Sequence, residues 1–328
     1  MKYDVITIGG ATEDVSLYSS DGVLLKSNHD ALRQKLLAFE YGSKVVVDKA
    51  YSNFGGGAAN VAVNLAGLGY KTAILINIGA DERGRRIFNN FKKHDVATKL
   101  VNIDFNSESA VSFIIINKTG ERLIFTDRGA NKKLQLKEEN LKAIKNCRWV
   151  YIASLANDNW QADLKKIFAV CGPKIIWNPG HEQLIAGYDK LAKFLKQTDV
   201  LCLNKEEAIE LVLSVEEYKH KTISYLNDVK NLLKIINSFG PQMVLITSGS
   251  LGADVYNGLK YYHVAPVKSK KIADKTGVGD AFCSTFLFGL EKCKGNISSA
   301  LKLASRQAAA VMTVLGAQNG LLKKKDLK

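Results

Sequence analysis

Two glycines and two aspartates stand within seven residues, Asp274-Lys-Thr-Gly-Val-Gly-Asp280, directly before the apolar run 281–290. The apolar run has the length and composition of a buried helix. Residues 277–279 would then supply free backbone amides at the helix N-terminus, where unpaired N–H groups and the helix dipole attract anions, phosphate above all. The adjacent Asp280 could serve as the N-cap of this helix or as a group that does chemistry.

A second unusual stretch carries two amides on an apolar segment, Phe54-Gly-Gly-Gly-Ala-Ala-Asn60-Val-Ala-Val-Asn64. Asn60 and Asn64 are four residues apart and therefore share a helix face. A buried amide without a hydrogen bond costs roughly 1–3 kcal/mol, so these side chains should meet a polar ligand or cap the turn at 55–57. A dinucleotide-binding fingerprint is excluded, because its sixth position would be Asn60 and no strand is expected before Gly55. The chain also has no Walker A sequence.

The elements that would position these groups alternate along the chain. β-Branched runs separated by helical patterns predict a mainly parallel sheet with helices on both faces. Asp14 follows the first of these strands, and ligands of such sheets lie at the carboxyl ends of the strands. The expected core strands are 3–8, 72–78, 149–152, 174–177, 200–203 and 243–247, with a helix over 59–68.

Two segments interrupt this alternation. Residues 15–52 contain the expected strands 22–25 and 44–47, and residues 99–127 contain a hairpin of 110–116 and 122–125 around the turn 117–120. We therefore expect a small β-sheet lid made of 15–52 and 99–127. The α/β core would comprise 1–14, 53–98 and 128–328.

Composition limits the classes of partner. The 328 residues carry a formal net charge of +14, but the lysines are spread out and only 323–325 form a dense run. A solvated basic surface is therefore expected rather than a nucleic-acid site. No apolar run reaches the length of a membrane span, and the start shows no signal peptide. Five scattered cysteines without CxxC spacing fit a reducing compartment, so we expect a cytoplasmic protein.

Taken together, these motifs resemble those of the ribokinase-like (PfkB) carbohydrate kinase family, over residues 3 to about 320. The shared motifs, in order, are Gly9-Gly10 with Asp14, Gly55-Gly56-Gly57-Ala58-Ala59-Asn60, Gly79-Ala-Asp81-Glu-Arg-Gly84, Asn204-Lys-Glu-Glu207, Thr247-Ser-Gly249-Ser-Leu-Gly252 and Asp274 to Asp280. The resemblance implies a three-layer α/β/α core with a β lid. It also implies an ATP-dependent kinase that uses Mg²⁺ to phosphorylate a sugar hydroxyl, with a homodimer formed through the lid.

The resemblance also implies roles for individual residues. Asp280 would be the catalytic base, and an aspartate, with an ordinary pKa near 3.9, should stay ionised at a helix N-terminus. The phosphoryl group would be held by the amides of Gly277, Val278 and Gly279. Substrate hydroxyls would be bound by Asp14, Gly56 and Asn60, and the nucleotide by Asn204, Thr247, Gly249, Gly252 and Thr276.

Two metal roles follow from the same resemblance. Glu207 would organise Mg²⁺ through water, and Asp274 would help to form a site for a monovalent cation such as K⁺, together with backbone near 316–318. Gly320 stands where some family members have serine, and Gly57 where ribokinases have lysine. The first departure bears on cation activation, and the second argues against ribose itself as the substrate.

Three alternatives remain open at this stage. A nucleoside kinase of the same family could stack a base on aromatic residues of the lid, such as Phe39, Tyr41 and Tyr51. A regulator that binds a sugar or nucleotide without catalysis is disfavoured by the intact Asp280 loop. A basic nucleic-acid-binding protein would be retained on heparin or DNA with a steep salt dependence.

Overall fold

The computed structural model describes residues 2–26, 35–116, 122–268 and 272–327. Its largest sheet has eight strands in the order β16-β15-β14-β13-β12-β11-β1-β6. Their bounds are β1 (Val5–Ile8), β6 (Thr72–Leu75), β11 (Trp149–Ile152), β12 (Lys174–Trp177), β13 (Val200–Asn204), β14 (Met243–Thr247), β15 (Ala253–Tyr256) and β16 (Tyr261–Val264). The six strands from β6 to β14 pair in parallel, whereas β15 and β16 add an antiparallel edge. The predicted mainly parallel sheet is thus confirmed.

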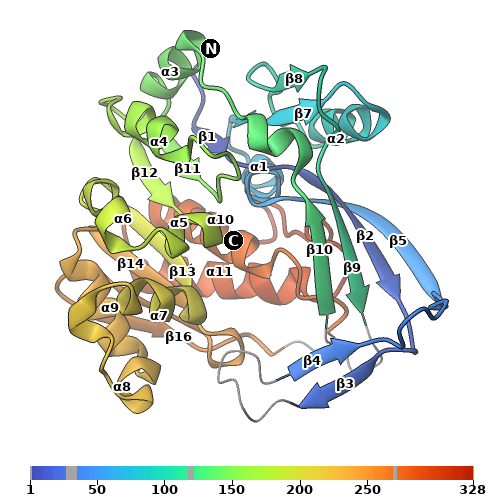
Figure 1. The fold of residues 1–328 in the computed structure, drawn as a ribbon. Coiled ribbons are helices and arrows are strands. Elements are labelled where there is room, and N and C mark those ends of the chain that lie inside the picture. Colours follow the sequence, from blue (N-terminus) through green and yellow to red (C-terminus); the bar gives the residue numbers. More distant parts are fainter. Residues whose placement is uncertain (1, 27–34, 117–121, 269–271, 328) are drawn as a thin grey trace.

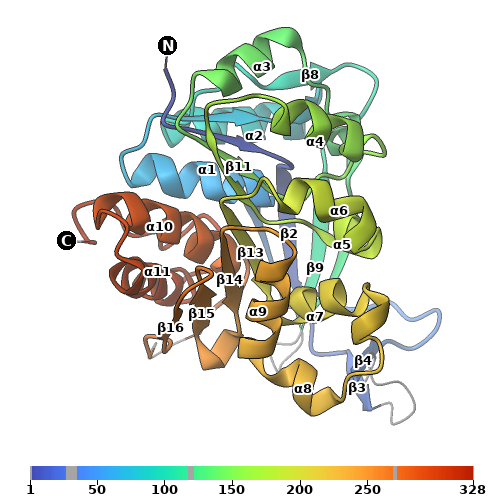
Figure 2. The same cartoon turned by 90° about the vertical axis from the view of Figure 1, so that its left-hand side faces the viewer.

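Helices cover both faces of this sheet, because successive strand residues point to opposite sides. In β1, for example, Val5 joins the core on one face and Ile6 the core on the other. Figure 2 shows the two helical layers. One layer holds α1 (Gly57–Gly67), α2 (Glu82–Lys93), α10 (Val278–Lys292) and α11 (Ile297–Val311). The other holds α3 (Glu138–Lys145), α4 (Trp160–Phe168), α5 (His181–Ile185), α6 (Tyr188–Leu195), α7 (Lys205–Leu213), α8 (Ile223–Asn227) and α9 (Val229–Ser238).

A second sheet of four strands projects from one edge of this core (Figure 1). Its order is β10-β9-β2-β5, formed by β10 (Arg122–Asp127), β9 (Val111–Ile116), β2 (Thr12–Tyr18) and β5 (Lys49–Gly55). The predicted hairpin is confirmed as the antiparallel pair β9–β10, while its turn at 117–120 lies outside the described residues. The sheet includes residues 12–14 and 53–55, which were expected in the α/β core.

The remaining short strands differ in part from those that local sequence patterns predict. A hairpin of β3 (Val23–Lys26) and β4 (Lys35–Ala38) contains the predicted strand near 22–25. The predicted strand at 44–47 is wrong: Val46 is exposed, and its backbone bonds to the side chains of Ser19 and Asp21 instead of to a strand. The run 72–78 is divided between β6 and β7 (Asn77–Gly79), which pairs with β8 (Asn102–Asp104).

The expectation that no strand precedes Gly55 is also wrong, since β5 ends there. However, β5 pairs antiparallel with β2 in the four-stranded sheet and not with the parallel core. The βαβ unit of a dinucleotide fold is therefore not formed at this position.

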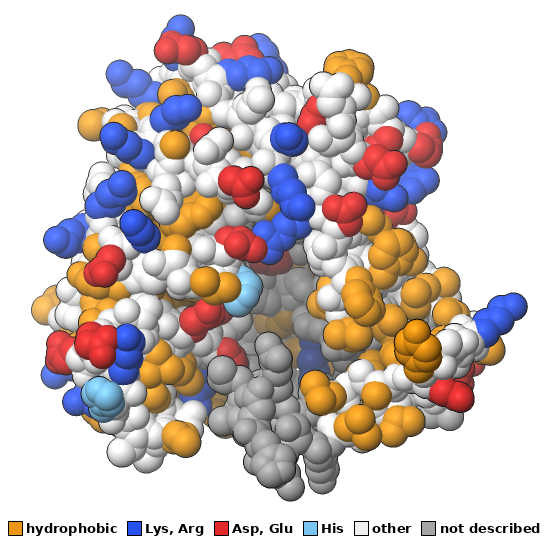
Figure 3. Space-filling model, viewed as in Figure 1, with side chains coloured by type: hydrophobic (Ala, Val, Ile, Leu, Met, Phe, Trp, Pro, Cys, Tyr) orange, Lys and Arg blue, Asp and Glu red, His pale blue; other side chains and the backbone are white. Residues whose placement is uncertain are grey.

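Charged side chains of both signs are interspersed on the face seen in Figure 3, whereas hydrophobic side chains gather over the four-stranded sheet and the β3–β4 hairpin. Exposed hydrophobic side chains of these elements include Val23 and Leu25 on β3, Phe113, Leu123 and Phe125 on one face of the β9–β10 pair, and Ile124 on its other face. Within the described part of the chain, none of the helices has both the length and the apolar composition needed to span a bilayer.

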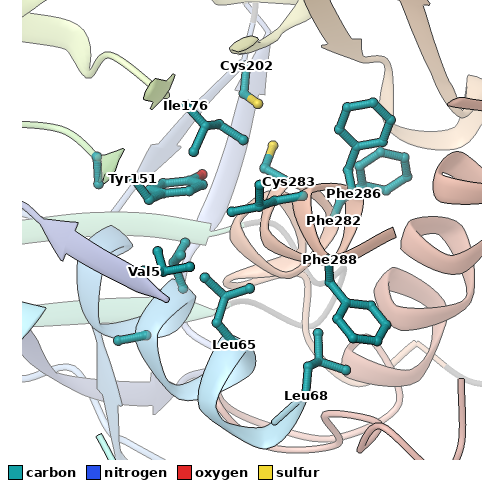
Figure 4. Close-up of a cluster of buried hydrophobic side chains, with 14 of the residues drawn as sticks. Val5, Leu65, Leu68, Tyr151, Ile176, Cys202, Phe282, Cys283, Phe286 and Phe288 are labelled. Carbon is teal, nitrogen blue, oxygen red and sulfur yellow. The ribbon is translucent and has the colours of Figure 1, made fainter. Parts of the chain in front are cut away.

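Helices α1 and α10 pack side by side against the sheet, and α11 packs on α10. Figure 4 shows the apolar cluster at this junction, where Cys283 of α10 faces Tyr151 of β11 and Leu65 of α1 lies beside them. The contact between α10 and α11 is close at Gly289, where an added Cβ would lie 2.6 Å from the Cα of Ala300. This packing fixes the position of α10, whose first turn carries Asp280.

Gly289→Ala should lower the free energy of unfolding by ~1–3 kcal/mol, because the methyl group overpacks the α10–α11 contact. Gly67→Ala is a matched control at the exposed end of α1, where an added Cβ meets nothing within 4 Å. Urea unfolding of the two variants measures the difference. Equal stability of both variants would contradict the close contact at Gly289.

Candidate active site

The first turn of α10 is the centre of the candidate site. The helix begins at Val278, three residues before the apolar run, and its N-cap is Gly277 in the left-handed conformation, with φ 72°. Asp280 therefore lies inside the first turn, so the N-cap interpretation of Asp280 is wrong. Among the described residues, no acceptor bonds to the amides of residues 277–279, as expected for the start of a helix.

Glycine is required at 277 for two reasons. A positive φ is costly for any other residue, and an added Cβ would lie 2.4 Å from the Cβ of Ala317. At Gly279 an added Cβ meets nothing within 4 Å. A side chain would therefore find room at position 279 but none at position 277.

The carboxylate of Asp280 accepts a hydrogen bond from Asn60 Nδ2, at 2.8 Å from Oδ2. Removal from water raises the pKa of Asp280 to about 6, with a smaller increase from the charge of Asp14 and a decrease from the Asn60 bond. This differs from the low pKa expected for a helix N-terminus, because desolvation outweighs the helix dipole. Asp280 is therefore mostly ionised at pH 7 and is more basic than an ordinary aspartate.

Asp14 lies on β2, in the four-stranded sheet, and is buried. Its Oδ1 accepts a hydrogen bond from Thr12 Oγ1 at 2.8 Å. Burial raises the pKa of Asp14, and the bond from Thr12 lowers it. Gly55 on the neighbouring strand β5 makes room for the carboxylate, since a Cβ there would lie 2.0 Å from Oδ2. Position 55 must therefore be glycine for the Asp14 side chain to pack there.

Gly56 caps α1 with φ 92°, and an added Cβ would lie 2.5 Å from the carbonyl oxygen of Gly10. Gly57 is close to the Asp280 carboxylate, because a Cβ at position 57 would lie 3.6 Å from Asp280 Oδ1. These glycines bring the end of β1, the start of α1 and the start of α10 together.

The two asparagines of α1 have separate surroundings. Asn64 is buried and donates to Ser284 Oγ (2.7 Å) and Thr285 Oγ1 (2.9 Å), while its oxygen accepts from Gln307. Asn60 contacts Asp280 and Gln318. The prediction that both amides are hydrogen-bonded is confirmed, but neither caps the 55–57 turn. Asn64 joins α1, α10 and α11, and only Asn60 points to the candidate site.

The residues assigned to the nucleotide lie at the carboxyl ends of the next strands. Asn204 ends β13 and Thr247 ends β14, and the two are register partners. Gly249 and Gly252 follow with φ values of 53° and 96°, and a Cβ on Gly252 would lie 2.0 Å from the carbonyl oxygen of Val264. The loop at 248–252 therefore needs glycine at 252 for backbone packing.

The Asn204–Glu207 motif forms a capping box at the start of α7. Glu207 N donates to Asn204 Oδ1, and Asn204 N donates to Glu207 Oε2, both at 2.8 Å. Burial, and to a lesser degree the charge of Asp280, raises the pKa of Glu207 to about 7. In the described part of the chain, no hydrogen bond or ion pair involves Glu207 Oε1, so this oxygen is available to a ligand.

Asp274 fixes the loop before α10. Its Oδ1 accepts from the amide and hydroxyl of Thr276, and its Oδ2 accepts from Gly316 N at 3.0 Å. The carboxylate thereby ties the loop to the segment that follows α11. Gly320 has φ 70°, a left-handed conformation that favours glycine at this position.

The residues of the motif at 79–84 make capping and packing contacts within the fold. Asp81 caps α2, accepting from Gly84 N at 2.7 Å, and its carboxylate also bonds to the amide and hydroxyl of Ser109. A Cβ on Gly84 would lie 2.2 Å from the carbonyl oxygen of Gly79. The motif therefore anchors α2 to the segment leading into β9.

Two side chains behind the site were not predicted, although the backbone near 316–318 was expected to join a cation site. Gln318 donates to Asn60 Oδ1 at 3.1 Å, and Asn90 of α2 donates to Gln318 Oε1 at 2.7 Å. Each contact spans more than 200 positions of the chain. No local pattern in the sequence signals either residue.

Gly277→Ala should lower the free energy of unfolding by ~1–3 kcal/mol, because alanine in the left-handed region is strained and its methyl group meets Ala317. Gly279→Ala places a methyl group in open space of the same turn and should leave stability unchanged or slightly higher. Thermal or urea unfolding distinguishes them. A Gly277→Ala variant as stable as Gly279→Ala would contradict the observed helix start.

The chain matches known proteins over nearly its whole length. Residues 29–324 match the model of the pfkB family carbohydrate kinases. An uncharacterized sugar kinase from Archaeoglobus fulgidus is 27% identical over 266 residues, which are 80% of this chain and 100% of the relative.

Two solved structures share the fold. Arabidopsis thaliana ribokinase, complexed with ribose and ATP, superposes with a TM-score of 0.80 at 19% identity, covering 100% of this chain and 98% of that one. Methanocaldococcus jannaschii nucleoside kinase gives 0.77 at 21% identity, covering 99% and 97%. The fold is thus ribokinase-like, and the chain belongs to the pfkB family of carbohydrate kinases.

Proposed function

We propose that this enzyme transfers the γ-phosphoryl group of ATP to a hydroxyl of a sugar or sugar-like substrate, with Asp280 as the catalytic base. One observation carries the proposal: a partly buried carboxylate stands in the first turn of a helix, beside amides that have no acceptor among the described residues. A base for a hydroxyl and a cradle for a phosphoryl group are thereby adjacent.

The carboxylate of Asp280 takes the proton of the acceptor hydroxyl as that oxygen attacks phosphorus. A pKa of about 6 suits this task, since the group is ionised at neutral pH yet accepts a proton more readily than an exposed aspartate. The Asn60 bond holds one carboxylate oxygen and leaves Oδ1 for the substrate. Asp280 thus needs no rearrangement to act as a base.

The amides of Gly277, Val278 and Gly279 stabilise negative charge on the transferred group. Phosphoryl transfer requires little covalent work from the protein, so positioned donors supply much of the rate enhancement. The open space at Gly279 allows phosphate oxygens to approach the backbone. This role needs no side chain from the three residues.

The acceptor is bound by Asp14, Gly56 and Asn60. A carboxylate and a carboxamide recognise hydroxyl groups directionally, and Asp14 approaches from the four-stranded sheet while Asn60 approaches from α1. Burial of Asp14 favours a ligand whose hydroxyl groups hydrogen-bond to the carboxylate. A polyhydroxylated acceptor fits this pair.

The nucleotide is held by Asn204, Thr247, Gly249, Gly252 and Thr276, at the edge where β13 and β14 end. Glu207 would hold Mg²⁺ through water, a mode that Mg²⁺ favours with carboxylate oxygens. The available Oε1 and the excess of negative charge near Asp280 fit a cation at this place. When bound, Mg²⁺ supplies charge neutralisation of the phosphates. Asp274 would contribute to a monovalent-cation site.

The segments 15–52 and 99–127 act as a lid, in which the four-stranded sheet carries Asp14 over the acceptor. The exposed apolar side chains on β9 and β10 would be covered in a homodimer formed through these sheets. Exposed apolar side chains that gather in this way mark an interaction site.

A nucleoside kinase is the second candidate. Tyr18 and Tyr51 on β2 and β5 form an edge-to-face pair with ring centroids 5.8 Å apart, and Tyr51 is 39% exposed. Exposed rings on the lid could stack on a nucleoside base. In this case nucleosides, and not free sugars, would be phosphorylated.

ADP release with ATP and Mg²⁺ should be measured across pentoses, hexoses, keto-deoxy sugars, sugar phosphates and nucleosides. We expect one class to be turned over strongly, and Asp280→Asn should reduce its kcat by ~10²–10⁴-fold because the base is lost. ATP binding should be nearly unchanged in this variant.

Asp14→Asn is the control that distinguishes the loss of a substrate-binding residue from the loss of the catalytic base. It should raise KM for the acceptor far more than KM for ATP and retain turnover at saturating acceptor. If Asp280→Asn keeps near-full activity, the base is wrongly assigned. ATP binding without turnover of any compound would support the regulator instead.

A further inference from the structure

A chain of three side-chain amides leads from α2 to the candidate base. Asn90 Nδ2 donates to Gln318 Oε1 (2.7 Å), Gln318 Nε2 donates to Asn60 Oδ1 (3.1 Å), and Asn60 Nδ2 donates to Asp280 Oδ2 (2.8 Å). Asn60 and Gln318 are buried. The chain therefore runs through the protein interior and joins α2, the segment after α11, α1 and α10.

All three bonds of this chain have the same direction. A carboxamide has a donating and an accepting end, and rotating it by 180° exchanges them. Because Gln318 accepts from Asn90 with its oxygen, its nitrogen faces Asn60. Asn60 must then accept with its oxygen and present its nitrogen to Asp280. A rotated Asn60 would instead direct its oxygen at the carboxylate, which is unfavourable when Asp280 is ionised.

We propose that Gln318 and Asn90 are positioning residues for this kinase, whose relay of amides keeps the N–H group of Asn60 turned toward the ionised base. The inference rests on the proposed function in that Asp280 is taken as the base. Neither residue touches the reacting atoms: both act through Asn60. Buried amide networks of this kind favour a single arrangement when every member is satisfied.

The relay also has a consequence for proton affinity. A hydrogen bond donated to the charged form of an acid favours that form, and the Asn60 bond lowers the pKa of Asp280 against the effects of burial and Asp14. Other titratable groups around Asp280 are Asp14 from β2, Glu207 from α7 and Tyr151 from β11. None of these belongs to the relay, so a variant of Asn90 leaves them in place.

Asn90→Asp tests the direction of the relay, because a carboxylate at this position can only accept hydrogen bonds. Gln318 would then turn its nitrogen to residue 90 and its oxygen to Asn60, and the rotated Asn60 would present its oxygen to Asp280. We expect the acid limb of the kcat profile to move up by about one pH unit, with KM for ATP unchanged. The near-isosteric Asn90→Leu removes the first donor without reversing the direction of the other hydrogen bonds. It should therefore cause a smaller shift of the acid limb.

Asn89→Asp is the matched control, since it adds the same charge at the neighbouring, exposed position of α2. Its acid limb should coincide with that of the unmodified enzyme. Carboxyl ¹³C NMR gives the pKa of Asp280 without any substrate, with the resonance identified by its loss in Asp280→Asn. An Asp280 midpoint raised in Asn90→Asp but not in Asn89→Asp supports the relay.

Equal midpoints in Asn90→Asp and Asn89→Asp would overturn the relay. That outcome leaves the proposed function standing if Asp280→Asn is inactive. Conversely, an active Asp280→Asn removes the assignment of Asp280 as the base, whereas the NMR comparison still decides whether the relay controls this carboxylate.

Discussion

The candidate site depends on keeping the partly buried carboxylate of Asp280 charged. Burial and the nearby Asp14 both oppose ionisation of Asp280, and together they raise its pKa to about 6. The Asn60 amide favours the charged form from one side. The balance leaves an aspartate that is ionised at neutral pH and still basic enough to accept a proton from an alcohol.

The fold serves this balance by packing α1 against α10. Asn64 bonds to Ser284 and Thr285 in the buried contact, which fixes the rotation of one helix relative to the other. One turn earlier on the same face, Asn60 then meets Asp280. The first turn of α10 is held from the other side by the close approach of Gly277 to Ala317. The carboxylate and the open amides therefore belong to one rigid unit.

Much of this arrangement could be predicted from local sequence patterns. The β-branched runs at 149–152 and 243–247 form strands, and the glycine pattern before residue 281 correctly indicated a helix start with free amides. The exact start could not be predicted, because Gly-Val-Gly has low helix propensity and the packing of Gly277 on Ala317 decides it. By contrast, the run at 44–47 has high strand propensity but forms no strand, because no partner strand lies beside it.

Contacts between segments far apart in the chain could not be predicted from local sequence patterns. The antiparallel strands β15 and β16 extend the main sheet without having been expected. Gln318 and Asn60 are separated by 258 positions, and only the folded chain brings their amides together. The increased basicity of Asp280 was also unforeseen, since it depends on how deeply neighbouring elements bury the group.

The most direct test of the account is the pH dependence of stability in Asp280→Asn. A carboxyl group whose pKa is raised by folding destabilises the protein above its unfolded pKa, and the penalty vanishes when the group is protonated in both states. The variant should therefore be more stable than the unmodified protein at pH 7.5, with the difference disappearing as the pH falls to about 4. Equal or lower stability of the variant at pH 7.5 would contradict a partly buried, charged Asp280 with a raised pKa at the centre of this site.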